Sequence, residues 1–522
     1  MPKLLPIGIQ SFENIIQNNY LYIDKTQYIY DLVKTSKGAF FLHRPRRFGK
    51  SLLTSTLKAL FEAKRELFDG LYIGSSSYPF PEHPVIHLDF SEITAKTEEQ
   101  FTQALRHHLL NIAKYHHLDI ITTQLHLAPD NATLLKDIIQ ILANKAKVVV
   151  LIDEYDAPII NNLNPKKLDT AQAIREELKT FFATIKANDD DLRFVFLTGI
   201  SKFSKVGVFS GLNNLEDISM DANFTNILGI SQQELEFHFR EDVQVLAETQ
   251  NRSVDAVWDE IRRWYNGFCF APDTPKLYNV ISIFKLIKTG QFDNYWFQTA
   301  TPSFLIDQLK QQQVAIRQLE ALALPKHLLD SYELETLNIY TILFQTGYLT
   351  MKGRDRFGDF LLSYPNQEVR ESFLKHLFDA YSHLPVVEGH QLLKDLHQQL
   401  RKHEWQAFVN SFNYLLASIP HQIHLAYEAY YHSLFHITLS RLGMYVQSEV
   451  STHKGRIDTI IQTETEVFLF EFKKDESLEE AESQVVKRGY VQALKYLAKP
   501  IIVVLINFNT KERQIDVFRV LD

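Results

Sequence analysis

The fold is decided between residues 38 and 51, where the chain reads Gly-Ala-Phe-Phe-Leu-His-Arg-Pro-Arg-Arg-Phe-Gly-Lys-Ser. The first five residues form a short apolar run that predicts a strand. An amphipathic segment from Leu52 to about Ala63 predicts a helix directly after the serine. Backbone N–H groups at a helix N-terminus attract anions, so this strand, loop and helix predict a phosphate-binding loop.

The loop matches most of the Walker A pattern, Gly-x-x-x-x-Gly-Lys-Ser/Thr. Gly49, Lys50 and Ser51 occupy the last three positions, while Arg44 replaces the first glycine. We expect Lys50 to reach the β- and γ-phosphate oxygens and the Ser51 hydroxyl to bind Mg²⁺. Arg46 and Arg47 would add positive charge for a polyphosphate. Taken alone, the same residues would also suit a basic surface loop.

A second motif, residues 148–156, reads Val-Val-Val-Leu-Ile-Asp-Glu-Tyr-Asp, and it favours the nucleotide site. A continuous apolar run ending in acids is typical of a strand buried on both faces of a parallel sheet. Asp153 is placed to hold Mg²⁺ through water, and Glu154 to orient or deprotonate the attacking water. Thr198, at the end of another strand, is either a γ-phosphate sensor or a strand cap. Strands near 85–89 and 193–199, alternating with helices near 97–115, 132–145 and 168–186, predict a doubly wound α/β domain.

Near the C-terminus two carboxylates and a lysine fall on neighbouring predicted strands. Asp458 follows Gly-Arg-Ile, and Glu471 and Lys473 lie two apart in Phe-Glu-Phe-Lys, so they share one strand face. Two acids can hold a divalent cation while an ammonium orients the attacking water, as phosphodiester hydrolysis requires. Gln484, on a following amphipathic stretch 478–497, would support the site, and Glu428, on a preceding helix, is an additional candidate ligand. Two solvated acids and a surface lysine are the alternative.

The surroundings of the triplet favour a folded site. Strands are expected near 444–449, 456–462, 466–473 and 501–508, with a helix before the first three and another before the fourth. This order resembles the PD-(D/E)xK nuclease core.

Composition limits the classes of protein that the chain can belong to. With 522 residues it exceeds one ordinary core, and 45% hydrophobic with 23% charged residues is typical of soluble globular proteins. The single cysteine, Cys269, excludes an internal disulfide framework and favours a reducing compartment. No apolar run approaches the length of a membrane span, so we expect a cytoplasmic protein without a membrane partner. The net charge of −8 means that nucleic acid would have to bind local basic patches.

The middle of the chain is predicted to be helical from about residue 230 to 330. Beyond it, a helix over 334–344 and strands over 348–351 and 360–364 suggest a winged-helix unit. Its loop, Lys-Gly-Arg-Asp-Arg at 352–356, could contact DNA or pack domains together.

Seven segments together resemble one family, the bacterial AAA-ATPase-like proteins with a C-terminal PD-(D/E)xK nuclease-superfamily domain. They are residues 22–26 (YIDKT), 44–51 (RPRRFGKS), 151–156 (LIDEYD), 198–203 (TGISKF), 213–217 (NNLED), 264–267 (WYNG) and 455–458 (GRID). The arginine at the first Walker glycine is usual in that group. Residues 22–26 could pack beside an adenine or order the N-terminus.

We therefore expect an α/β chain of three domains. Residues 1–229 form an AAA-like P-loop ATPase domain with a parallel sheet, 230–385 a helical lid and winged-helix-like region, and 386–522 a restriction-endonuclease-like PD-(D/E)xK domain. ATP and Mg²⁺ are the expected cofactors, with Mn²⁺ as an alternative at the nuclease site.

The expected activity is an ATPase coupled to a metal-dependent nuclease acting on nucleic acid, with DNA preferred and a role in defence or mobile-element processing. The alternative is an ATP-controlled switch or assembly protein whose nuclease-like domain binds without cutting. Assembly into a homo-oligomer is left open.

Overall fold

The computed structural model describes residues 3–118, 125–163, 167–202, 208–209, 211–297, 303–330, 338–419, 428–442, 444–452 and 455–521. The chain forms two compact units: residues 1–299 with 323–368, and residues 300–322 with 369–522. The domain boundaries after residues 229 and 385 stay a prediction. None of the described helices has the length and apolar character needed to cross a membrane.

The first unit is built on a five-stranded parallel sheet with the strand order β2-β3-β4-β1-β5. The strands are β1 (Gly38–His43), β2 (Val85–Asp89), β3 (Val148–Asp153), β4 (Leu192–Gly199) and β5 (Glu216–Asp217). Every residue of β3 and β4 is buried, as their apolar sequences predict for strands covered on both faces. Because β1, β4 and β3 are parallel neighbours, their carboxyl ends lie in one row.

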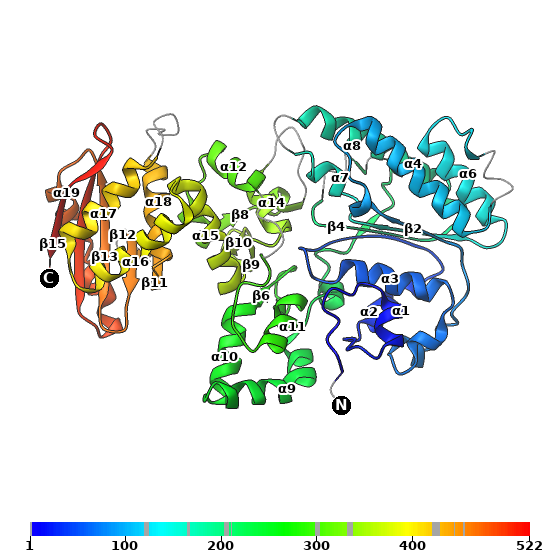
Figure 1. Cartoon of the computed structure of the whole chain (residues 1–522), viewed down its shortest axis with the longest axis horizontal. Helices are drawn as coiled ribbons and strands as arrows, with labels where there is room; N and C mark the ends of the chain where they lie inside the picture. The colour runs from blue at the N-terminus through cyan, green and yellow to red at the C-terminus, as the bar shows by residue number, and fades with distance from the viewer. Residues whose placement is uncertain are drawn as a thin grey trace. The chain divides into compact units, whose positions relative to one another are not determined.

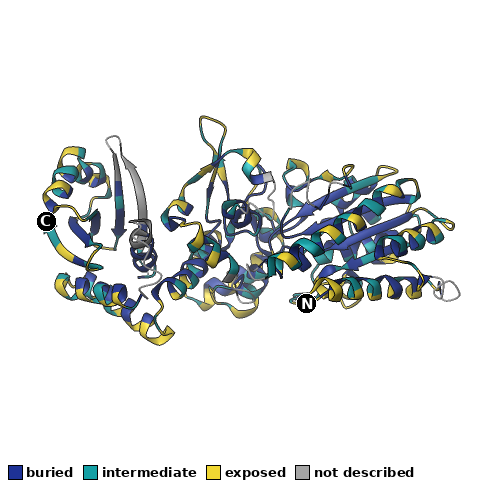
Figure 2. Ribbon diagram, turned by 90° about the horizontal axis from the view of Figure 1, so that it is seen from above, coloured by how far each residue is buried: buried dark blue, intermediate teal, exposed yellow. Residues whose placement is uncertain are grey.

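Helices cover both faces of this sheet, which confirms the doubly wound α/β prediction (Figure 1). One face carries α3 (Lys50–Phe61), with α1 (Phe12–Gln17) and α2 (Thr26–Val33) on the same side. The other carries α4 (Glu98–Tyr115), α6 (Asn131–Ala143), α7 (Ala157–Ile160) and α8 (Leu168–Ala187). Figure 2 shows the strands buried and the exposed residues on the outer sides of the helices.

A helical subdomain follows the sheet, as predicted. It contains α9 (Gln232–Thr249), α10 (Val254–Tyr265) and α11 (Val280–Thr289), with a hairpin of β6 (Asn266–Phe268) and β7 (Leu277–Tyr278) between the last two helices. These elements share a core of their own. Residues 230–297 are called the lid below.

The winged-helix-like region has a three-stranded sheet in the order β8-β10-β9. Its elements are β8 (Leu322–Leu324), α13 (Lys326–Asp330), α14 (Ile339–Gln345), β9 (Thr350–Arg354) and β10 (Phe360–Ser363). The predicted helix over 334–344 begins only at Ile339 in the structure, after its cap Asn338, and 334–337 lie outside the described residues. Every residue of α14 except Tyr340 is buried, so this helix offers no wide exposed face for reading a DNA groove.

The second unit contains a mixed five-stranded sheet in the order β11-β12-β13-β14-β15. The strands are β11 (Tyr445–Thr452), β12 (Gly455–Gln462), β13 (Val467–Lys474), β14 (Ile501–Asn509) and β15 (Gln514–Leu521). Strands β13 and β14 are parallel and the other pairs antiparallel. Strand β15 was not predicted from the sequence.

Helices complete this unit. The parallel pair is joined by a crossover of α19 (Leu478–Arg488) and α20 (Tyr490–Leu494), and α19 shares a core with the sheet. The expected single amphipathic stretch 478–497 is interrupted at Gly489, whose φ of 64° ends α19. The other helices are α12 (Ser303–Gln311), α15 (Gln367–Ser382), α16 (Val386–Arg401), α17 (Trp405–Ala417) and α18 (Glu428–Ser440), with a short 3-10 helix, η7 (Ile316–Glu320).

Candidate functional site

The phosphate loop joins β1 to α3 through two residues with left-handed backbone. Arg47 has φ 66° and Gly49 has φ 101°, directly before α3 begins at Lys50. Glycine adopts this conformation without the steric cost that a side chain brings, which explains why the motif requires it there. The buried Lys50 ammonium donates to the carbonyl oxygens of Arg44 at 3.1 Å and Pro45 at 3.3 Å. The lysine therefore lies inside the loop that it is expected to serve.

The two acids expected beside this loop lie at the carboxyl end of β3, and Thr198 lies at the carboxyl end of β4. Asp153 is 1% exposed, and its carboxylate accepts hydrogen bonds from the Thr198 hydroxyl and from the backbone N–H of Glu154 at 3.1 Å. Burial raises the pKa of the half-buried Glu154, while the cations of Lys50 and, more weakly, Arg46 oppose the rise. A carboxylate with a raised pKa is a better proton acceptor. The structure thus gathers Lys50, Asp153, Glu154 and Thr198 in one place.

The remaining predicted residues of the loop have different surroundings. Arg46 is exposed, and its carbonyl oxygen accepts from the lid side chains of Asn279 at 3.3 Å and Trp296 at 3.4 Å. The Arg47 guanidinium donates to the carbonyl oxygen of Tyr295, so this arginine is held by the lid. Ser51 is the second residue of α3 and half-buried.

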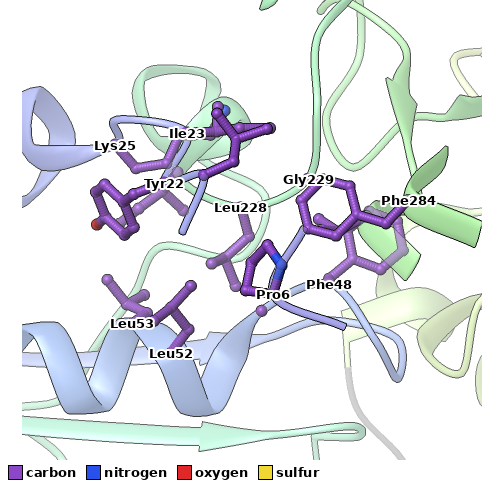
Figure 3. Close-up of a pocket in the computed structure, with 14 residues that line it drawn as sticks. Pro6, Tyr22, Ile23, Lys25, Phe48, Leu52, Leu53, Leu228, Gly229 and Phe284 are labelled. Atoms are coloured by element: carbon purple, nitrogen blue, oxygen red, sulfur yellow. The ribbon is translucent and has the colours of Figure 1, made fainter. Parts of the chain in front are cut away.

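A pocket of about 70 Å³ opens beside Gly49 (Figure 3). Tyr22, Ile23 and Lys25 line one side of it, and the first turn of α3 lines another. The lining is mostly apolar, with further residues from the loop before the lid and from α11: Ile227, Leu228, Gly229, Val280 and Phe284. Tyr22, Ile23 and Lys25 therefore form one wall of a small apolar pocket beside the phosphate loop.

Lys25 also joins this wall to the lid. Its ammonium is 2.6 Å from the carboxylate of Glu234, which caps the start of α9.

The second group of predicted residues lies on β12, β13 and α19. The carboxylate of Asp458, inside β12, accepts from the backbone N–H of Phe472 at 2.9 Å, next to Glu471. Glu471 is 1% exposed and accepts from the side-chain amide of Gln484. The amide oxygen of the same glutamine accepts from the Lys473 ammonium at 2.9 Å. Gln484 therefore bridges Glu471 and Lys473. The two residues lie two apart in β13, so they share one strand face as their spacing predicts.

The chemistry of these donors fits a hard divalent cation. Asp458 and Glu471 offer only oxygen ligands, which Mg²⁺ and Mn²⁺ prefer. Among the described residues no group of three or more His, Cys, Asp or Glu side chains could hold a metal. Glu428 begins α18, but its side chain lies outside the described part of the structure. The described donor set is thus two carboxylates.

Two family models match the chain where these two groups lie. Residues 6–209 match the model described as predicted AAA-ATPase, and residues 426–518 match the PD-(D/E)XK nuclease superfamily. A relative from Azotobacter chroococcum mcd 1, described as "Uncharacterized protein in vnfD 5'region", is 33% identical over 526 residues, covering 98% of both chains. The chain belongs to the AAA-ATPase-like family with a C-terminal PD-(D/E)XK domain.

In the AAA-ATPase-like domain, sequence reasoning gave no role to Asp156. This carboxylate is fully buried and accepts from the backbone N–H groups of Ile200 and Ser201 and from the Ser201 hydroxyl at 2.6 Å. It fixes the segment after β4 to the acids after β3. A Cβ on Gly199 would lie 2.8 Å from this carboxylate, so the close approach requires glycine.

In the PD-(D/E)XK domain, Arg488 was not among the predicted site residues. Its pKa is raised by the Tyr490 hydroxyl, 3.0 Å away, and by the negative charges of Glu471 and Asp458. A positive charge therefore lies near the two carboxylates, at the end of α19. Its recurrence with Gln484 at helical spacing was the signal in the sequence.

Proposed function

We propose that the protein binds and hydrolyses ATP and uses it to control a metal-dependent phosphodiesterase that cuts nucleic acid, with DNA as the preferred substrate. The bridge from Glu471 through Gln484 to Lys473, beside Asp458, is the observation that carries this proposal. Four side chains from β12, β13 and α19 meet there, and Asp458, Glu471 and Lys473 supply the acids and the ammonium that phosphodiester hydrolysis uses. A role in defence or mobile-element processing extends the proposal by analogy with other nuclease-superfamily proteins.

In the ATP site, Lys50 would exchange its two carbonyl partners for the β- and γ-phosphate oxygens. Ser51 and Asp153 would hold the Mg²⁺ that accompanies ATP, which offsets the charge of the phosphates. Glu154 takes a proton from the attacking water, and its raised pKa favours that transfer. The Thr198 hydroxyl donates a hydrogen bond to the Asp153 carboxylate in this structure. It is placed to donate to the γ-phosphate instead when ATP is bound.

In the nuclease site, Asp458 and Glu471 would hold Mg²⁺ or Mn²⁺, a Lewis acid that lowers the pKa of bound water and stabilises phosphoryl oxygens. Lys473 orients the attacking water. Gln484 keeps the Lys473 ammonium beside Glu471. Glu428 is an additional proposed ligand.

Control by ATP is supported by α15, which begins in the first unit and continues in the second. Within the first unit, Glu368 accepts from the backbone N–H groups of Tyr295 and Trp296, the segment that also binds Arg47 of the phosphate loop. Within the second unit, Arg370 donates to Glu320 at 2.7 Å and to Ser440 of α18 at 3.3 Å. One helical turn thus carries an anchor in each unit.

The test is incubation of plasmid DNA, linear DNA and RNA with Mg²⁺ or Mn²⁺, comparing wild type with Asp458→Ala. We expect cleavage by wild type and at least a hundredfold loss in the variant. Equal inertness of both proteins on all substrates would contradict the nuclease proposal.

The second candidate is an ATP-controlled switch or assembly protein, favoured by the net charge of −8, which gives no general attraction to nucleic acid. Light scattering with and without ATP distinguishes it, since a switch changes mass or shape while DNA stays intact. In either case the single buried cysteine, Cys269, supports a cytoplasmic location.

A further inference from the structure

Arg44 stands where the generic phosphate loop has glycine, yet its side chain is fully buried. One guanidinium nitrogen donates to the carbonyl oxygens of His43 at 2.9 Å and Ser219 at 2.8 Å, and the other terminal nitrogen to that of Phe224 at 3.4 Å. Burying a charge without partners is costly, so these three carbonyls account for its place inside the unit. The loop entry is thereby tied to the segment 219–224, beyond β5.

The planar face of the same guanidinium lies over an aromatic ring. Its central carbon is 4.1 Å from the centre of the Phe270 ring, in the lid. Burial lowers the pKa of Arg44 to about 9, opposed by the negative charge of Asp217. A flat fork that stacks and donates in its own plane suits arginine and not lysine. The position therefore selects arginine by shape as well as charge.

The backbone of Arg44 lies at the centre of the nucleotide site. Its N–H donates to the carbonyl oxygen of Gly199, at the end of β4, at 3.1 Å. Its carbonyl oxygen is the nearer of the two that hold the Lys50 ammonium. Because the Arg44 side chain is held in place, its backbone N–H and carbonyl groups are held as well. The Arg44 side chain therefore sets the position of the Lys50 ammonium relative to a bound phosphate.

We infer that Arg44 is a positioning residue that sets the shape of the phosphate loop from behind and thereby the affinity for ATP. The inference rests on the proposed ATP function and deepens it. Arg44 would touch no phosphate; it acts through Lys50 and through the backbone between them.

A matched control is available in the same unit. Arg193 is also buried, donates to the Val33 carbonyl oxygen at 2.8 Å and has its guanidinium 5.7 Å from the Phe61 ring. It is the second residue of β4, at the end of the strand opposite the phosphate loop. Arg193→Lys therefore perturbs a buried arginine without touching the nucleotide site.

The test is the Kd for Mg·ATP of the full chain, measured by calorimetry well below the melting temperature of each variant. Arg44→Lys is expected to raise Kd at least tenfold and Arg193→Lys less than twofold, while both lower the melting temperature. Arg44→Gly is expected to raise Kd as well, although it restores the generic motif.

If Arg44→Lys does not fold, the Kd for Mg·ATP is measured for Phe270→Leu instead. Loss of the stacked ring is expected to raise this Kd at least threefold. A Kd for Arg44→Lys, or for Phe270→Leu in its place, within twofold of wild type would overturn the inference alone. Failure of wild type to bind ATP would overturn the proposed ATP function and the inference with it.

Discussion

Glu368 should make the first unit less stable as pH rises, and Glu368→Gln should remove that dependence. The carboxyl of Glu368 is fully buried. It accepts hydrogen bonds from the backbone N–H groups of Tyr295 at 2.7 Å and Trp296 at 2.8 Å and from the Ser282 hydroxyl at 2.9 Å. Burial raises its pKa from 4.5 to about 7, against the effect of these donors and of Arg47. The protonated form is therefore the one that the folded unit prefers.

The sign follows from proton binding. Between pH 4.5 and about 7 the folded unit binds this proton more tightly than the unfolded chain, so the free energy of unfolding falls as pH rises. The rise in pKa corresponds to about 3 kcal/mol between pH 4.5 and pH 8, a large fraction of the stability of one unit. Glutamine is neutral at every pH and carries no such dependence.

The assay is urea unfolding at pH 5, 6, 7 and 8, followed by tryptophan fluorescence, which includes Trp296 at the site. The difference between wild type and Glu368→Gln isolates this group from others that titrate. Glu13→Gln is the control, because Lys64 lowers the pKa of Glu13 and moves its titration below this range. Parallel loss of stability in wild type and Glu368→Gln from pH 5 to 8 would show that Glu368 is not the source of the pH dependence.

Three further substitutions test single contacts. Glu154→Gln should keep ATP binding within a few fold and lower hydrolysis at least a hundredfold, measured by phosphate release; unchanged hydrolysis would remove Glu154 as the base. Gln484→Ala removes a hydrogen bond from each of two ionised partners, about 1.5–3 kcal/mol apiece, and should lower cleavage at least tenfold without changing ATP binding. Gly347→Ala would place a Cβ 2.7 Å from Pro45 at a φ of 88°, so we expect a melting temperature several degrees lower and weaker ATP binding; wild-type values for both would show that the loop yields freely.

Local pattern was enough to predict most strands of the two sheets and several of the side chains that lie together. The run 148–152 is apolar throughout because β3 is covered on both faces, and such a run can be recognised without knowing its neighbours. Glu471 and Lys473 share a strand face by their spacing, and Gln484 meets both because its helix crosses back over that strand. These predictions needed only periodicity and element order.

The contacts that the sequence did not predict join segments far apart in the chain. The position of Arg44 in the loop does not show that Ser219 and Phe270, more than 170 residues away, enclose its side chain. In the sequence Asp156 is one more acid after β3. Its role depends on the hydrogen bond from the backbone N–H of Ser201, in the segment after β4. Strand β15 lies at an edge of its sheet with Ile515 as its one buried residue, so its weak apolar alternation gave little signal. The roles of these residues depend on partners far away in the sequence. The spacing of residues within one segment does not reveal those partners.

Whether cutting is conditional on ATP is decided by the initial rate of DNA cleavage with Mg²⁺, measured with and without ATP in wild type and Lys50→Ala. We expect ATP to change the wild-type rate at least tenfold and to leave the Lys50→Ala rate unchanged. Asp458→Ala should be inactive with or without ATP. Wild-type cleavage at one rate, whatever the ATP concentration, would show that ATP does not control the cutting.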